Sequence, residues 1–81
     1  MKFFVYVLGS KNKSKLTTYV GYTNNLLKRI VLHNSGKGAK FTRGRKWYLM
    51  YYETFKSKSK AMKREYFIKK DKKFREKIKL K

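Results

Sequence analysis

The sequence predicts an α+β fold in which a small three-stranded antiparallel sheet is flanked by two or three helices, in the order β-β-α-β-α. Two observations predict this class. Three short segments are rich in aromatic and β-branched residues, as strands are, and two others carry apolar residues at helical spacing. With 81 residues, no internal repeat and no long linker, the chain is expected to form one domain, 1–81, around one modest core.

The first two strands are expected to form a hairpin. Residues 2–10 (KFFVYVLGS) alternate apolar side chains to both faces, which predicts a strand that is covered on both sides. Residues 11–15 are polar and predict the turn, and residues 16–22 (LTTYVGY) predict the second strand. Gly21 weakens that strand unless a bulge or a close approach requires the missing side chain.

The first helix is predicted over residues 25–34, with Thr23 or Asn24 as its N-cap and Gly36 as its stop. A basic loop, which we expect to be mobile, follows over residues 37–45. The helix carries two adjacent stripes: Leu26, Ile30 and His33, and beside them Leu27, Val31 and Asn34.

The C-terminal part predicts one more strand and one or two helices. Residues 46–55 (KWYLMYYETF) are apolar on both faces of a strand. Residues 57–81 predict helix with a break near Asp71, so that residues 71–81 form a basic helical tail.

The charge predicts a polyanionic partner. The chain has 24 Lys and Arg against 4 Asp and Glu, a formal net charge of +20. Self-repulsion at this charge opposes compaction, so binding a polyanion is expected to stabilise the fold. Nucleotide bias alone would also raise the glutamate content, yet there are only three glutamates. We therefore favour nucleic acid as the partner.

Composition also argues against several other classes of protein. Aromatic residues make up 17% of the chain, which excludes a disordered basic tail. There is no cysteine, so we expect no disulfide framework or thiolate metal site, and a reducing cytoplasm fits. No apolar run approaches the roughly 20 residues of a membrane span. A membrane-surface or protein-interaction module is kept as a minor alternative.

Glu65 is the most informative single residue. On the predicted helix, its neighbours at i−4, i−3 and i+3 are Ala61, Met62 and Ile68, so the carboxylate lies on the apolar stripe. A carboxylate there needs a cation or a donor. It either pairs with a buried arginine or tyrosine hydroxyl, which periodicity slightly favours, or it is the lone protein ligand of a hard divalent cation.

Two further groups of polar residues are candidates for phosphate chemistry. Arg29 and His33 are an i, i+4 pair, which is either the polar edge of an amphipathic helix or a phosphate-binding pair. Tyr6 and Tyr19 lie on the two hairpin strands and are expected to become neighbours. The loop lacks both familiar nucleotide-binding patterns and is instead expected to contact phosphates through its cations: Lys37, Lys40, Arg43, Arg45 and Lys46.

Four separated motifs, in order, resemble those of the GIY-YIG nuclease superfamily, and most closely its small single-domain UPF0213 group. They are FFVYVL, TYVGYT, LLKRIVLHNSGKGAKFTRGRKWYLMYYE and SKAMKREYFIKK, which together span about residues 3–70. Phe4 stands where the family has the glycine of GIY, and Val20 replaces the isoleucine of YIG.

The resemblance implies a catalytic site made of Tyr6, Tyr19, Arg29, His33 and Glu65, and a function as a metal-dependent endonuclease. Glu65 would hold one Mg²⁺ or Mn²⁺ ion, and Arg29 would offset the charge of the transition state. A tyrosine hydroxyl would help to activate the water, and His33 would orient a tyrosine or contact phosphate. Tyrosine ordinarily titrates near about pH 10, so this role requires a depressed pKa or a proton relay.

Two functions therefore remain from the sequence. The first is an endonuclease that acts on nucleic acid, with DNA favoured and branched or single-stranded forms included, and a protein partner for targeting is compatible with the small size. The second is a non-catalytic DNA- or RNA-binding module that keeps the fold. The presence of Glu65 favours the first, because an acid beside phosphate hinders binding unless a metal intervenes.

Overall fold

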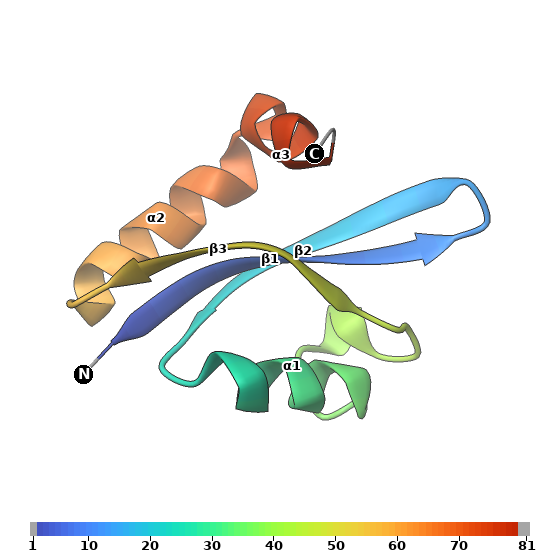
Figure 1. The fold of residues 1–81 in the computed structure, drawn as a ribbon, viewed down its shortest axis with the longest axis horizontal. Helices are drawn as coiled ribbons and strands as arrows, with labels where there is room; N and C mark the ends of the chain where they lie inside the picture. Colours follow the sequence, from blue (N-terminus) through green and yellow to red (C-terminus); the bar gives the residue numbers. More distant parts are fainter. Residues whose placement is uncertain (1, 80–81) are drawn as a thin grey trace.

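The computed structural model describes residues 2–79, which form a three-stranded sheet with helices on both faces (Figure 1). The sheet and helices confirm the predicted α+β class, including the helix break at Asp71. Residues 80–81 of the predicted tail lie outside the described residues. The elements are β1 (Phe3–Asn12), β2 (Lys15–Thr23), α1 (Leu26–Asn34), the 3₁₀ turn η1 (Lys40–Thr42), β3 (Tyr48–Phe55), α2 (Lys58–Lys70) and α3 (Lys72–Lys79).

Strand β1 is the centre of the sheet, whose order is β2-β1-β3 with antiparallel neighbours on both sides. This position explains why its sequence is apolar on both faces. Tyr6 pairs with Gly21 of β2 and with Tyr52 of β3. A bulge between Val7 and Leu8 interrupts the pairing with β3.

The hairpin is longer than the sequence predicts. Pairing of β1 with β2 continues to Asn12 and Lys15, so that Lys13 and Ser14 alone make the turn. Lys13 adopts a left-handed φ of 59°, which allows this tight reversal. The predicted five-residue turn is therefore wrong, and the paired strands extend beyond the rest of the sheet (Figure 1).

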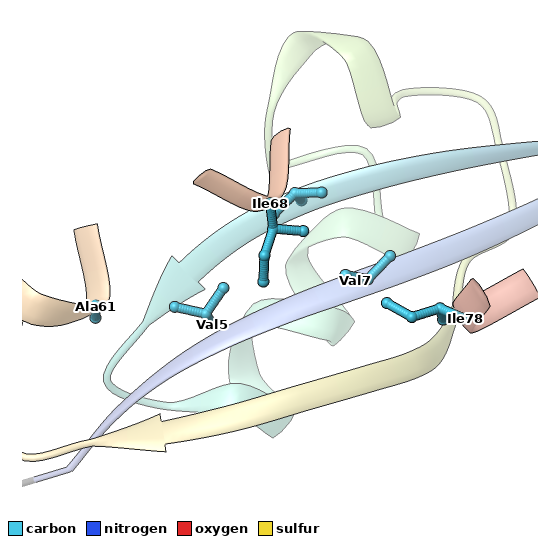
Figure 2. Close-up of a cluster of buried hydrophobic side chains, with 6 residues drawn as sticks. Val5, Val7, Ala61, Ile68 and Ile78 are labelled. Carbon is cyan, nitrogen blue, oxygen red and sulfur yellow. The ribbon is translucent and has the colours of Figure 1, made fainter. Parts of the chain in front are cut away.

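Helices α2 and α3 cover one face of the sheet and enclose its main apolar core (Figure 2). Met62, which the sequence places on the apolar stripe, is instead 45% exposed. Phe74 and Ile78 pack α3 against this core, so the predicted basic tail is part of the folded unit through residue 79. The buried residues are Val5, Val7, Val20, Ala61, Ile68 and Ile78.

Helix α1 covers the opposite face with only one of its two stripes. The stripe of Leu26, Ile30 and His33 faces the sheet, whereas Leu27 and Val31 of the second stripe are 78% and 64% exposed. The apolar core on this face is small and is built from Tyr6, Leu8 and Trp47.

The N-cap of α1 is Asn25 rather than Thr23 or Asn24. Asn25 Oδ1 accepts a hydrogen bond from the Lys28 backbone N–H at 3.1 Å. Thr23 Oγ1 accepts from the Asn25 N–H, also at 3.1 Å, and this local turn shifts the start of the helix by one residue. Gly36 ends the helix with φ +80°, as predicted.

Strand β3 begins two residues later than predicted because Trp47 turns into the core. The Trp47 N–H donates to Asn34 Oδ1 at 2.6 Å, and Asn34 Nδ2 donates to the Trp47 carbonyl at 3.0 Å. Tyr48, Leu49 and Tyr52 are exposed, so β3, although apolar on both faces, is only partly covered. Among residues 2–79, no helix has the length and apolar character that crossing a membrane requires.

Candidate active site

A hydrogen-bonded chain of buried side chains connects β1, α1 and η1. His33 is fully buried. Its Nε2 lies 2.8 Å from Tyr6 Oη, and its Nδ1 lies 2.9 Å from Thr42 Oγ1. Both ring nitrogens are thus occupied within the protein, which favours the expected role of orienting a tyrosine over contact with a phosphate.

The partners in this series of hydrogen bonds show which atom is the donor in each of them. Thr42 Oγ1 donates its single hydrogen to the Ala39 carbonyl at 2.8 Å, so it accepts from the Nδ1–H of His33. The neutral imidazole then has an unprotonated Nε2, which accepts from the Tyr6 O–H. Burial is the main cause that lowers the pKa of His33, and the nearby charge of Arg29 lowers it further. The ring is therefore neutral at pH 7.

The Tyr6 hydroxyl stays protonated at neutral pH. Burial raises the pKa of Tyr6 to about 12, and interaction with the Arg29 guanidinium lowers it only in part. Smaller effects from the neighbouring Tyr19 and from the charge of Glu65 raise it further. The pKa of Tyr6 is thus raised and not depressed, so a role for Tyr6 as a base would require a proton relay.

Two glycines make room for this chain. A methyl group on Gly21 would lie 2.5 Å from Tyr6 Oη, and one on Gly38 would collide with His33 Nδ1. Gly21 is needed because the Tyr6 hydroxyl lies over it, which is a close approach of the kind that the sequence requires there.

The basic loop is anchored over the site and is not the free loop that the sequence predicts. Phe41 stacks on Tyr19, with ring centroids 6.1 Å apart and planes 21° apart. Trp47 Nε1 donates to the carbonyl of the buried Thr42 at 2.8 Å. The five residues whose cations are predicted to contact phosphate are all exposed: Lys37, Lys40, Arg43, Arg45 and Lys46.

Tyr19 also lies where the hairpin geometry predicts it. Its ring centroid is 6.5 Å from that of Tyr6 and 5.0 Å from that of His33. Tyr19 pairs with Leu8, two residues along β1 from Tyr6, so the two tyrosines are diagonal neighbours on one face.

Arg29 lies at the mouth of a recess of about 390 Å³, which Tyr22 and Lys58 also line. None of the ion pairs formed among residues 2–79 uses its guanidinium. The same group acts on the Tyr6 hydroxyl, so its positive charge lies close to that hydroxyl.

Glu65 approaches this region from α2, on the other side of the sheet. Its side chain is 19% exposed, and Lys69 Nζ lies 3.5 Å from Oε2. The expected alternative partner, a buried arginine or tyrosine hydroxyl, is replaced by this long contact to a lysine one turn along the helix. Its charge acts on Tyr6, so the carboxylate and the hydroxyl are within electrostatic range of each other.

The carboxylate of Glu65 suits a single hydrated divalent cation. Within residues 2–79, no group of three or more His, Cys, Asp or Glu side chains is placed to hold a metal. A cation at Glu65 would therefore complete its shell with water and phosphate oxygens, which is the ordinary habit of Mg²⁺.

Sequence reasoning missed a second polar cluster on the α2 face. Arg64 Nε and Nη2 donate to the two carboxylate oxygens of Glu53 at 2.8 and 2.9 Å, and Tyr51 also donates to Glu53. Alternation along β3 could have placed Tyr51 and Glu53 on one face, but nothing local identifies Arg64 as their partner. Thr42 and Gly38, which set the orientation of His33, were missed as well.

Comparison with known proteins identifies the family. The sequence model of the GIY-YIG catalytic domain matches residues 2–79. A UPF0213 protein of Clostridium perfringens is 53% identical over 68 residues, which cover 83% of this chain and 70% of the relative. Another, from Oceanobacillus iheyensis, is 47% identical over 78 residues, or 95% of this chain and 86% of the relative.

A solved structure has a similar fold. The solution NMR structure of the UPF0213 protein BH0048 from Bacillus halodurans aligns with a TM-score of 0.56 at 40% identity, and the match covers 96% of this chain and 82% of that one. The family is one of nuclease-type catalytic domains that interact with nucleic acid. The chain belongs to the GIY-YIG family and, within it, to the UPF0213 group.

Proposed function

We propose that this protein is a metal-dependent endonuclease that hydrolyses phosphodiester bonds of nucleic acid, with DNA as its substrate. The observation that supports this most strongly is the Tyr6 hydroxyl, which donates to a neutral buried histidine and is acted on by both the cation of Arg29 and the carboxylate of Glu65. A fully satisfied polar chain can also rigidify a core, so what favours catalysis is that a cation and a carboxylate both act on the same hydroxyl.

The proton path follows from the hydrogen bonds. A water beside the scissile phosphate gives its proton to Tyr6 Oη as it attacks phosphorus, and Tyr6 passes its own proton to His33 Nε2. The imidazolium keeps its Nδ1–H on Thr42, which the Ala39 carbonyl holds in place. Tyr6 thus acts as a base without ever forming a free phenolate, which its raised pKa would make unfavourable.

Arg29 and Glu65 supply the charges. The guanidinium of Arg29 offsets the negative charge that develops on the phosphoryl oxygens. Glu65 would hold one Mg²⁺ or Mn²⁺ ion, which when bound polarises the phosphate and stabilises the leaving oxygen. The exposed cations of the loop bind flanking phosphates. The absence of cysteine suits a reducing cytoplasm, where we place the activity.

The test is a cleavage assay on duplex, single-stranded, flap and bubble DNA, with Mg²⁺, Mn²⁺ or EDTA. We expect wild-type cleavage with either metal, and Glu65→Gln should fall to the rate seen in EDTA while it still binds DNA. Glu76→Gln is the matched control, because Glu76 is an exposed glutamate paired with Lys79 on α3. Binding without cleavage by the wild type on every substrate would instead support the non-catalytic module.

A further inference from the structure

The charge of this protein is divided unevenly along the chain. None of the four acidic residues precedes Glu53, so the hairpin, α1 and the basic loop contain no carboxylate. All four acids lie on β3, on α2, on α3 or at the junction of the two helices. The half of the molecule built from residues 2–52 is therefore purely cationic.

Within that half, the end of the hairpin and the basic loop enclose a groove of about 460 Å³. Arg45 Nη1 donates to Thr17 Oγ1 at 3.3 Å and so ties the loop to β2 across the groove. The residues that line it are Ser10, Lys11, Asn12, Arg43, Gly44, Arg45 and Lys46. Four of these seven are cations, and Ser10 and Asn12 add uncharged hydrogen-bonding groups.

We propose that this groove is a second nucleic-acid-binding site, which holds backbone phosphates of the DNA away from the scissile bond. The inference rests on the proposed function for the position of the scissile bond, but not for the binding itself. Phosphodiester is the ligand that the groove fits, because arginine and lysine donate to phosphate oxygens and no carboxylate competes with them. The hairpin contributes Ser10, Lys11 and Asn12 to the lining of the groove.

The strand sets the spacing between the two sites. Lys11 lies five residues beyond Tyr6 on β1, which is about 17 Å along an antiparallel strand. Duplex DNA advances about 3.4 Å per base pair, so this distance corresponds to about five base pairs. For a duplex that runs along β1, the groove would contact the backbone about five base pairs to one side of the cleaved bond, and not on the other side.

The binding test compares two triple variants with the same net charge. The groove variant is Lys11→Gln, Arg43→Gln and Lys46→Gln, and the control is Lys72→Gln, Lys73→Gln and Lys77→Gln on α3. With labelled duplex in EDTA, the groove variant should lower the slope of log K against log salt by roughly 2 to 3, at about 0.9 per phosphate contact. The control should change the slope by less than about 0.5. Equal changes in both variants would overturn the proposal.

A single substitution repeats the test with little change of shape. Asn12 lies exposed at the end of β1 and lines the groove, so Asn12→Asp introduces one carboxylate without disturbing the core. We expect Asn12→Asp to weaken duplex binding several-fold more than Asn12→Ala, which removes the amide but adds no charge. Equal affinities for the two variants would contradict phosphate binding in the groove.

Substrate length tests the spacing. Shortening the duplex to fewer than five base pairs on one side of the mapped cut should raise KM with little change in kcat. The groove variant should be insensitive to this truncation, and truncation on the other side should affect both proteins alike. If wild type and groove variant respond alike to this truncation, the flanking DNA does not contact the groove.

The two proposals fail separately. If the binding contrast is found in EDTA but no substrate is cleaved with metal, the groove stands and the endonuclease does not. If DNA is cleaved but the two triple variants bind alike, the endonuclease stands and the groove does not.

Discussion

The two faces of the sheet are built on adjacent residues of one strand and serve different purposes. On the face that α2 and α3 cover, Val5 and Val7 join a continuous apolar core. On the face that α1 covers, Tyr6 starts a buried polar chain through His33 to Thr42. Buried polar groups contribute less to stability than apolar packing unless each has its partner. We infer that the face under α2 and α3 mainly holds the fold together, with Glu65 as the exception, and that the other face carries the remaining site residues.

Two carboxylates on the α2 side of the sheet differ in how well they are paired. Glu53 accepts from both Arg64 and Tyr51, and the hydrogen bonds with Arg64 are the main cause that lowers the pKa of Glu53. Glu65 has one long contact to Lys69 within residues 2–79. A saturated carboxylate is structural, whereas one with a single weak partner can still take a cation.

The largest expected effect comes from removing the hydroxyl at the start of the polar chain. Tyr6→Phe should lower the single-turnover cleavage rate by about 10²–10⁴-fold, because general base catalysis through the relay is lost. Tyr51→Phe, which removes a hydroxyl from the other face, should leave the rate per folded molecule unchanged. A wild-type rate in Tyr6→Phe would remove Tyr6 from the mechanism.

Arg29 should have the next largest effect. Arg29→Ala is expected to lower kcat by about 10²–10³-fold, as removal of a transition-state charge donor does. The measurement is single-turnover cleavage at saturating DNA. A loss that appears only in affinity would make Arg29 a positioning contact for the phosphate.

Substitution of Arg64, on the opposite face, should reduce stability but leave cleavage almost unchanged. Arg64→Ala leaves the half-buried Glu53 without its bidentate partner, which should lower the free energy of unfolding by roughly 1–3 kcal/mol. Urea denaturation followed by the fluorescence of Trp47 measures this loss. Cleavage per folded molecule should stay within about twofold of wild type; a drop as large as that of Arg29→Ala would end the division between the faces.

The smallest expected effect is a pH dependence of stability from His33. The folded pKa of His33 lies below its ordinary value of 6.5, so the unfolded chain binds more protons as the pH falls below about 6.5. The free energy of unfolding should therefore decrease from pH 6.5 downward and level off below the folded pKa. His33→Gln should lose this dependence in the window above pH 5. Glu53, whose pKa is lowered from 4.5, contributes only at lower pH.

Local sequence predicts most of the fold but few members of the hydrogen-bonded chain of buried side chains. The apolar alternation of β1 predicts a central strand, and the spacing around Asp71 predicts the helix break, because both depend on neighbouring residues. The resemblance to the family implies the catalytic roles of Tyr6, Arg29 and Glu65. Thr42 could not be found in this way, since it meets His33 only when the loop folds back over α1.

The same limit explains the errors. The start of α1 depends on a single hydrogen bond that the Lys28 backbone N–H donates to Asn25 Oδ1, and three adjacent residues are all acceptable caps by type. The exposure of Met62 depends on how α2 is rotated on the sheet, which the apolar period gives only approximately.

The most direct test of the central claim, that neutral His33 accepts the Tyr6 proton, is long-range ¹H–¹⁵N NMR of the imidazole. The chain has one histidine, so its ring signals need no further assignment. At pH 7 we predict a protonated Nδ1 and an unprotonated Nε2, with the Nε2 shift changing in Tyr6→Phe as the hydrogen bond is lost. A protonated Nε2 in the wild type, or an imidazolium at that pH, would contradict the relay.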